Sequence, residues 1–208
     1  MLDELSRELE HSGRDAKVGD IGTILDRHLG NSVPDLRIVK SLVDNLGTSK
    51  RAIQLVSLLG CLQQRNLEPD SYLASKAIIA CRNWCEWGAA LDILQKMVAD
   101  TVDLDTVTYN VAVSACDKGG AGEKALGLLA QMASARVELS TITYNSAVSA
   151  CDKGGQWAKA LGLLVEMASA HVELNTRTYN AAISACEKGG AGARALSVLV
   201  EMASARVE

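Results

Sequence analysis

The sequence repeats itself every 35 residues, and this period restricts the possible folds more than any other feature. Tyr109, Tyr144 and Tyr179 are each 35 residues apart, and cysteines and methionines keep the same step. Segments 106–140 and 141–175 match at 26 of 35 positions without a gap. A unit this short cannot bury its apolar residues alone, so neighbouring copies have to stack. The period therefore predicts a solenoid built from stacked copies.

The repeat frame divides the chain into copies of unequal quality. They decay toward the N-terminus, although the Pro34-Asp35 pair recurs as Pro69-Asp70. We expect a degenerate copy or cap first, then a divergent copy, well-formed copies and a truncated last one. Their predicted boundaries are 1–35, 36–70, 71–105, 106–140, 141–175 and 176–208, and together they form one solenoid domain.

Each copy is predicted to hold a pair of α-helices, which makes the fold an all-α solenoid of helix-turn-helix repeats. In copy 106–140 the first apolar face consists of Tyr109, Ala112, Val113 and Cys116. Lys118 closes this helix and Gly119-Gly120 stop it, because glycine adopts the left-handed conformation that a helix end requires. A second helix is expected from about Glu123 to Ala135, with a buried face of Ala125, Leu128, Leu129 and Met132. Thr141 or Thr143 is expected to cap the next helix.

Composition excludes several other classes. Aromatic residues make up 3% and Phe is absent, which disfavours a β-sandwich. The net charge of −4 provides no global basic field, so nucleic-acid binding would need a local stripe of charge. No apolar run of about 18 residues occurs, so no membrane span is expected. The acidic residues near the N-terminus are unlike a transit peptide, so we expect a cytosolic protein or an address upstream of residue 1.

Three consecutive strings resemble the first helix of a pentatricopeptide repeat. They are TVTYNVAVSACDKGG (106–120), TITYNSAVSACDKGG (141–155) and TRTYNAAISACEKGG (176–190), and each is followed by a string similar to the second helix, such as KALGLLAQM. The resemblance is strong over 106–208 and fair over 71–105. It implies a right-handed superhelix that binds single-stranded RNA and serves RNA processing, stability or translation in a mitochondrion or chloroplast.

The resemblance also assigns base-reading residues, because this family reads about one base per copy. They are the fifth and the last residue of each copy: Ser75 with Asp105, Asn110 with Ser140, Asn145 with Asn175, and Asn180, whose partner lies beyond residue 208. By the family's code these pairs favour G, then C, then C or U, then a pyrimidine. The implied RNA sequence is 5′-G-C-Y-Y-3′.

Two further sets of residues follow from the resemblance. The base-sandwiching residues occupy the second position of each copy: Tyr72, Val107, Ile142 and Arg177. Val and Ile fit the family pattern, while Tyr and Arg depart from it but offer flat groups for stacking. The phosphate-contacting residues would be Lys118, Lys153 and Lys188, although a lysine at a helix C-terminus also complements the helix dipole. In copy 36–70 Lys40 would take the reading position with Asp70 as partner, so we expect that copy to be structural or to touch phosphate.

The remaining reactive residues are interpreted as core. The periodic cysteines lie on the apolar face and should be too far apart to form disulfides, and the tyrosines share that face. We find no arrangement of residues typical of an enzyme, a metal site or a cofactor site, and predict none. Another class of function stays open: a protein–protein scaffold or a structural subunit of an organellar complex. The acidic balance and the decayed copies favour this alternative.

Overall fold

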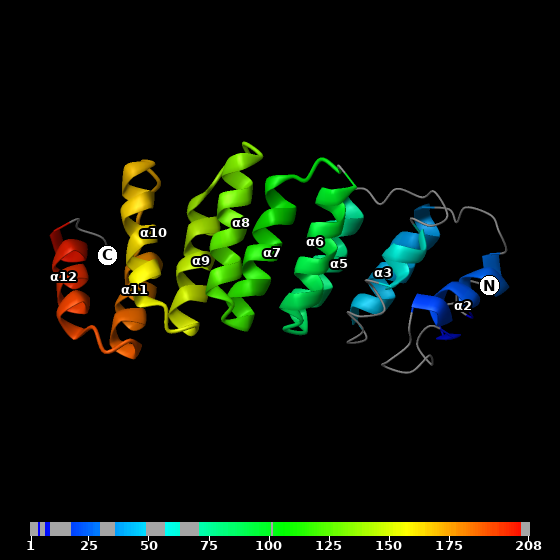
Figure 1. Cartoon of the computed structure of the whole chain (residues 1–208), viewed down its shortest axis with the longest axis horizontal. Coiled ribbons are helices and arrows are strands. Elements are labelled where there is room, and N and C mark those ends of the chain that lie inside the picture. The colour runs from blue at the N-terminus through cyan, green and yellow to red at the C-terminus, as the bar shows by residue number, and fades with distance from the viewer. Residues whose placement is uncertain are drawn as a thin grey trace. The chain divides into compact units, whose positions relative to one another are not determined.

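The computed structural model describes residues 4, 7–8, 18–29, 36–48, 57–62, 71–100 and 102–204. Within these ranges every regular element is an α-helix (Figure 1). The chain forms two compact units, Met1–Val111 and Ala112–Glu208, and their boundary falls inside helix α7 (Thr106–Gly119). The predicted ends of the first two copies, residues 35 and 70, lie outside the described residues.

The first unit consists of helices that pack side by side. Its bounded elements are α2 (Val18–Leu29), α3 (Leu36–Thr48), α5 (Ser71–Asn83), α6 (Trp87–Ala99) and the start of α7. Helix α5 packs against both α3 and α6. Leu73 and Cys81 of α5 and Met97 of α6 are buried in this core. The paired helices predicted for copy 71–105 are therefore α5 and α6.

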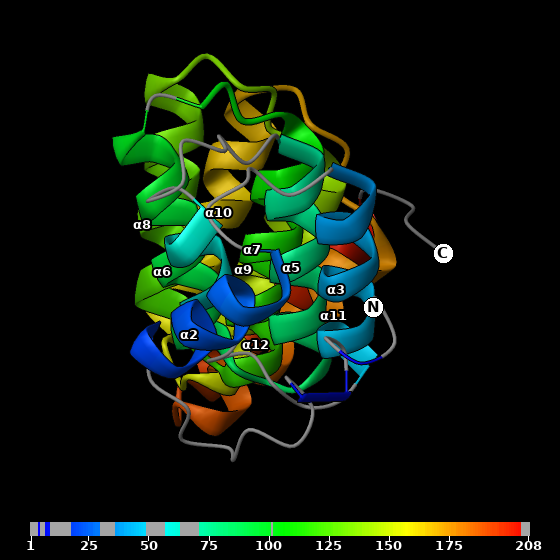
Figure 2. The same cartoon turned by 90° about the vertical axis from the view of Figure 1, so that its right-hand side faces the viewer.

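The second unit repeats the same hairpin more regularly. It contains the rest of α7 together with α8 (Gly122–Ser134), α9 (Thr141–Lys153), α10 (Trp157–Ser169), α11 (Thr176–Lys188) and α12 (Gly192–Ser204). Helix α9 contacts α8, α10 and α11, and α11 contacts α10 and α12 (Figures 1 and 2). The first helices of neighbouring copies, α9 and α11, thus lie directly against each other. No helix in the described ranges is long and apolar enough to cross a membrane.

The residues predicted as core are buried. Tyr109, Ala112, Val113 and Cys116 are at most 3% exposed, as are Tyr144 and Tyr179 at 1%. The Tyr144 hydroxyl donates a hydrogen bond to Glu166 Oε1 at 2.9 Å, and burial together with this contact raises the pKa of Tyr144 to about 12. Helix α8 buries the predicted face and begins one residue earlier than expected, at Gly122. Tyr109, Tyr144 and Tyr179 are therefore core residues and not stacking platforms.

The periodic cysteines are free thiols in the core, as predicted. Cys81, Cys116, Cys151 and Cys186 are each 0% exposed. Burial raises the pKa of Cys81 to about 12 and the pKa values of Cys116 and Cys151 to about 11. A thiol with so high a pKa is a poor nucleophile at neutral pH, because only the thiolate reacts.

The turn inside each hairpin depends on one residue in the left-handed region. Gly120, Gly155 and Gly190 occupy it with φ of +64°, +67° and +68°. At the equivalent place, 35 residues before Gly120, stands Cys85 with φ of 60°. The second glycine of each Gly-Gly pair therefore makes the turn that was predicted, and Cys85 makes it against its own preference.

Gly155→Ala is expected to lower the free energy of unfolding by about 1 kcal/mol, because a side chain is disfavoured at positive φ. A Cβ at position 155 meets nothing within 4 Å, so the effect isolates the backbone. Gly162→Ala is the matched control: it is helical, has equal space, and should raise stability by up to about 1 kcal/mol. Denaturant unfolding measures both, and equal effects of the two changes would contradict this account.

Thiol labelling at neutral pH should find one fast-reacting cysteine among the six. Cys85 is exposed, whereas Cys61 and the periodic cysteines are buried. Cys85→Ser should remove the fast phase in a reaction with a chromogenic disulfide, and denaturant should release the remaining thiols. A fast phase that survives Cys85→Ser would show that a buried thiol is accessible.

Candidate nucleic-acid interface

The last residue of a copy caps the first helix of the next copy. Ser140 is the N-cap of α9 and Asn175 is the N-cap of α11, and both have extended backbone. The Thr143 amide donates to Ser140 Oγ at 3.4 Å, and the Ser140 amide donates to Thr143 Oγ1 at 3.2 Å. The sequence-based expectation that Thr141 or Thr143 caps this helix is therefore wrong. Ser140 is the N-cap, and the Thr143 side chain accepts the return hydrogen bond from inside the first turn.

The fifth residues of the copies lie at different depths. Ser75 on α5 and Asn145 on α9 are buried, with 8% and 7% of their surface exposed. Asn110 on α7 is half-buried, and Asn180 on α11 is exposed. Asn145 is covered by the start of α11, which belongs to the following copy. The packing of that copy is what buries Asn145.

The predicted pair Ser75 and Asp105 meets through a buried threonine. Thr108 is 0% exposed, and its Oγ1 lies 2.7 Å from Ser75 Oγ. The same hydroxyl donates to Asp105 Oδ1 at 2.6 Å, and the Thr108 amide donates to that oxygen at 2.8 Å. Burial opposes ionisation of Asp105, but these hydrogen bonds outweigh it and lower the pKa of Asp105. Asp105 is therefore a carboxylate at neutral pH, which only accepts hydrogen bonds.

The predicted pair Asn145 and Asn175 meets in the same way. Thr178 is 0% exposed, and its hydroxyl donates to Asn145 Oδ1 and reaches Asn175 Oδ1 at 3.0 Å. Asn145 Nδ2 also donates to Asn175 Oδ1, at a long 3.4 Å. Sequence reasoning did not identify these threonines as the link, although their recurrence at the third position of copies was a visible signal.

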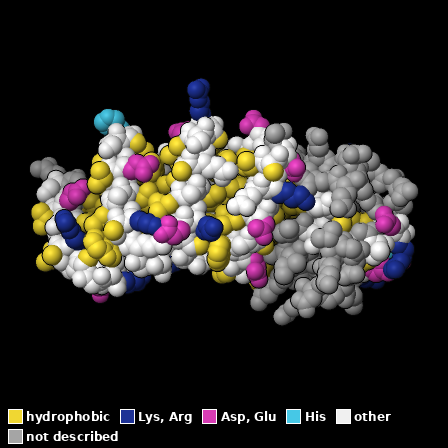
Figure 3. Space-filling model, viewed as in Figure 1, with side chains coloured by type: hydrophobic (Ala, Val, Ile, Leu, Met, Phe, Trp, Pro, Cys, Tyr) yellow, Lys and Arg dark blue, Asp and Glu magenta, His cyan; other side chains and the backbone are white. Residues whose placement is uncertain are grey.

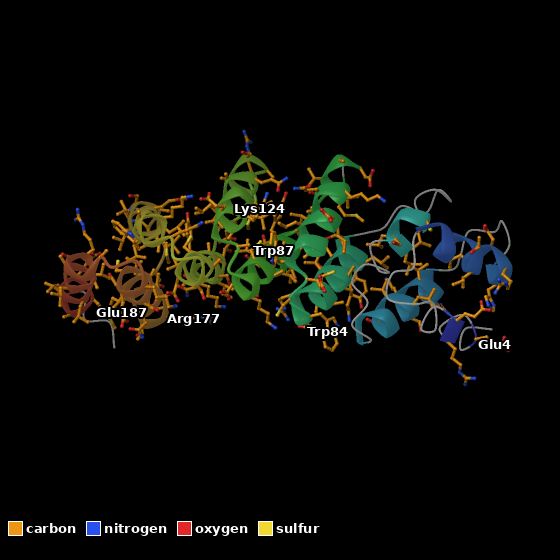
Figure 4. The ribbon with its side chains drawn as sticks, turned by 60° about the horizontal axis from the view of Figure 1, so that its bottom comes forward. Glu4, Trp84, Trp87, Lys124, Arg177 and Glu187 are labelled. Atoms are coloured by element: carbon orange, nitrogen blue, oxygen red, sulfur yellow. The ribbon has the colours of Figure 1, made fainter. Side chains whose placement is uncertain are left out.

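The residues predicted to sandwich bases are all at the surface. The exposed fractions are 49% for Tyr72, 59% for Val107 and 68% for Ile142, and Arg177 is exposed at the start of α11 (Figure 4). Exposed apolar side chains, Val107 and Ile142, thus occupy the same position of two consecutive copies.

Lys40 of the divergent copy lies over the ring of Tyr72. Its Nζ is 4.6 Å from the ring centroid, and Lys76 Nζ is 5.6 Å away. The partner predicted for Lys40, Asp70, lies outside the described residues. Lys40 thus takes part in a cation–π contact with the next copy, which agrees with the structural role expected for it.

Two of the three predicted phosphate lysines form ion pairs between copies. Lys153 Nζ is 2.8 Å from Asp117 Oδ1 and donates to the Asp117 carbonyl at 3.0 Å. Lys188 Nζ is 2.8 Å from Asp152 Oδ1. Both aspartate side chains are largely buried, at 12% and 14% exposed. Lys118 is exposed, and the residue 36 positions before it is Arg82, which cannot pair with it.

Within the described ranges no group of three or more His, Cys, Asp or Glu residues is close enough to hold a metal ion. The candidate residues placed above are amides, hydroxyls, the Asp105 carboxylate, lysines, the Arg177 guanidinium and exposed apolar side chains. Such groups recognise a ligand by hydrogen bonds and stacking.

Comparison with known proteins agrees with this arrangement. A family model described as the pentacotripeptide-repeat region of PRORP matches residues 62–208. No curated protein sequence matches the chain.

Solved structures share the fold at low sequence identity. The pentatricopeptide repeat protein PPR10 in complex with an 18-nt psaJ RNA element superposes with a TM-score of 0.65 at 19% identity, covering 100% of this chain and 34% of that one. The PPR domain of Arabidopsis thaliana protein-only RNase P 1, in complex with tRNA, gives a TM-score of 0.65 at 14% identity, covering 83% of this chain and 91% of that one. The chain spans about a third of the length of PPR10. The predicted α-solenoid fold is confirmed.

Lys153→Ala is expected to destabilise the protein by about 1 kcal/mol or more, because it leaves the largely buried Asp117 carboxylate without its partner. Lys118→Ala is the matched control, since it removes the same residue type at the same helix end of the preceding copy. We expect Lys118→Ala to change stability by less than about 0.5 kcal/mol. Urea unfolding curves measure the difference, and equal losses would show that the ion pair does not stabilise the packing of copies.

Proposed function

The chain belongs to the pentatricopeptide repeat family, and from this premise we propose that it binds single-stranded RNA with sequence preference. The observation that carries the proposal is the meeting of the fifth and last residues of a copy, Ser75 with Asp105 and Asn145 with Asn175, through one buried hydroxyl. Two polar side chains held this way can present a defined set of donors and acceptors to a base edge.

Stacking groups beside these pairs support the same reading. Helices α9 and α11 contact each other, and the exposed Ile142 and Arg177 lie in the first turns of the two helices. An aliphatic side chain and a guanidinium plane are both suitable surfaces for a base, and base stacking contributes about 1–3 kcal/mol per base. We propose Tyr72, Val107, Ile142 and Arg177 as the base-sandwiching residues.

Phosphate contacts are proposed mainly for Lys118. Lys153 and Lys188 already face Asp117 and Asp152, so each contributes less net positive charge to the surface. Single-strand affinity should fall with salt with a slope of about −0.7 per phosphate contacted. Lys118→Ala is expected to reduce that slope more than Lys188→Ala does.

The proposed target is a short single strand that contains 5′-G-C-Y-Y-3′, with Asn180 reading the last pyrimidine. The chain would act without catalysis, by covering the site or by bringing a partner enzyme to it. PPR10 and the PPR domain of protein-only RNase P 1 were solved with bound RNA, which is consistent with this class of ligand. A role in organellar RNA processing, stability or translation, in mitochondrion or chloroplast, is part of the proposal.

One observation favours the alternative of a protein–protein scaffold. Helix α12 exposes Leu196, Leu199 and Val200 at 65%, 51% and 65%, whereas Leu164, equivalent to Leu199 on α10, is 4% exposed. A separate groove of about 610 Å³ lies between α10 and α12, where other residues of α12, including Val198 and Glu201, line it. Figure 3 shows hydrophobic side chains on the surface of this part of the second unit. A partner held here by apolar contacts would resist salt, while bound RNA would not.

The double change Asn110→Ser with Ser140→Asp is expected to move preference at the second base from C toward G by roughly tenfold. Selection from a random RNA pool, followed by sequencing, measures the preference at each base. Ser134→Asp is the charge-matched control, because it adds the same carboxylate on the exposed end of α8. An unchanged second base would overturn the assigned register or the function.

A further inference from the structure

In two of the pairs proposed to read a base (reading pairs), one threonine hydroxyl lies between the fifth and the last residue of the copy. Thr108 Oγ1 contacts Ser75, Asp105 and, at 3.2 Å, the Ser71 hydroxyl, and Thr178 Oγ1 contacts Asn145 and Asn175. A threonine hydroxyl has one hydrogen to donate and two lone pairs that accept. Because Thr108 and Thr178 are 0% exposed, water does not supply an alternative partner. The direction of each hydrogen bond therefore follows from which neighbour takes that single hydrogen.

In the pair of copy 71–105 the last residue, Asp105, accepts the hydroxyl hydrogen of Thr108. Asp105 is an acceptor only, and Thr108 Oγ1 donates to its Oδ1 at 2.6 Å. The 2.7 Å contact between Thr108 and Ser75 must then run the other way, with Ser75 as the donor. Ser75 has no hydrogen left for a ligand. This pair consequently offers only acceptors: the lone pairs of Ser75 and the carboxylate of Asp105.

In the pair of copy 141–175 the fifth residue, Asn145, accepts the hydroxyl hydrogen of Thr178. Asn175 Oδ1 already accepts from the Thr178 amide at 3.1 Å and from Asn145 Nδ2 at 3.4 Å. The hydroxyl hydrogen of Thr178 is thus left for Asn145 Oδ1. Asn145 Nδ2 gives one of its two hydrogens to Asn175 Oδ1. With both amide oxygens occupied, the groups left for a ligand are the second Nδ2 hydrogen of Asn145 and the Nδ2 hydrogens of Asn175. This pair offers donors, the opposite polarity of the first.

We propose that Thr108 and Thr178 are positioning residues that set the hydrogen-bond polarity of the reading pairs, according to whether the last residue is a carboxylate or an amide. The inference rests on the proposed function. An acceptor-only pair selects guanine, whose Watson–Crick edge carries adjacent N–H donors. A donor-only pair selects cytosine over uracil, because cytosine places N3 and O2 acceptors side by side while uracil places an N–H between its oxygens.

The test compares Thr178→Val, which keeps the shape but removes the hydroxyl, with Thr178→Ser, which keeps the hydroxyl. Selection from a random RNA pool gives the preference at every base. The unchanged protein should favour cytosine over uracil at the third base by about tenfold. Thr178→Val should reduce this to less than about twofold while the first base is unchanged, and Thr178→Ser should restore it. A loss of stability alone would weaken binding at all bases equally.

A second comparison separates the action of the threonine hydroxyl on both members of the pair, here called the relay, from direct reading of the base by the last residue. Asn175→Asp gives Thr178 a carboxylate that captures its hydrogen, so Asn145 should turn its oxygen to the ligand and the third base should shift to uracil. This shift should appear with Thr178 present and shrink at least fivefold in the Thr178→Val background. An equal shift in both backgrounds overturns the relay, because the last residue would then act alone.

Thermal unfolding confirms that each variant is folded, and Thr108→Val provides the same test at the first base if Thr178→Val does not fold. Loss of the guanine preference there supports the relay. If the unchanged protein enriches no RNA sequence, the proposed function fails and the relay with it. If it enriches RNA but neither Val variant changes its own base, the relay alone is overturned.

Discussion

The cap between consecutive copies is the interaction on which both the packing and the candidate site depend. The first helix of a copy begins with N–H groups that have no partner within the helix, and the last residue of the preceding copy supplies an acceptor to one of them. Asp105, Ser140 and Asn175 stand at this place, and all are short polar side chains that suit an N-cap. The same side chains are the ones proposed to read a base. Because the cap fixes their position against the helix axis, the proposed recognition starts from a rigid part of the chain.

Besides the hydrophobic core, ion pairs between the copies hold the second unit together. The ion pairs of Lys153 with Asp117 and of Lys188 with Asp152 repeat with the copies, and each connects one first helix to the next. Their partly buried aspartates also reduce the positive charge available to a polynucleotide. Stacking and hydrogen bonding therefore have to contribute more to any RNA affinity than phosphate neutralisation does. This balance accords with the net charge of −4.

Sequence reasoning located the helices and the core because both depend on spacing within a copy. The apolar positions of copy 106–140 predicted the buried face of α7 and α8, and the glycine at position 120 predicted the turn. It placed the cap at Thr141 or Thr143 because threonine is a common N-cap, and did not weigh Ser140, which serves there with Thr143 as its reciprocal partner. For the candidate site, the family resemblance named the base-reading residues but did not predict how deeply each of them is buried. That Asn145 is buried while Asn180 is exposed depends on whether another copy packs above.

The repeat by itself determined the class of fold, the helix pairs and the buried thiols, since residues a few places apart on a helix fix one another's direction. Tertiary structure alone decided which hydroxyl meets which amide and which lysine meets which aspartate. Thr178 reaches Asn145 across 33 residues, and Lys153 reaches Asp117 across 36. Such contacts depend on the distance and angle between helices of different copies, which side-chain packing sets and no local pattern encodes.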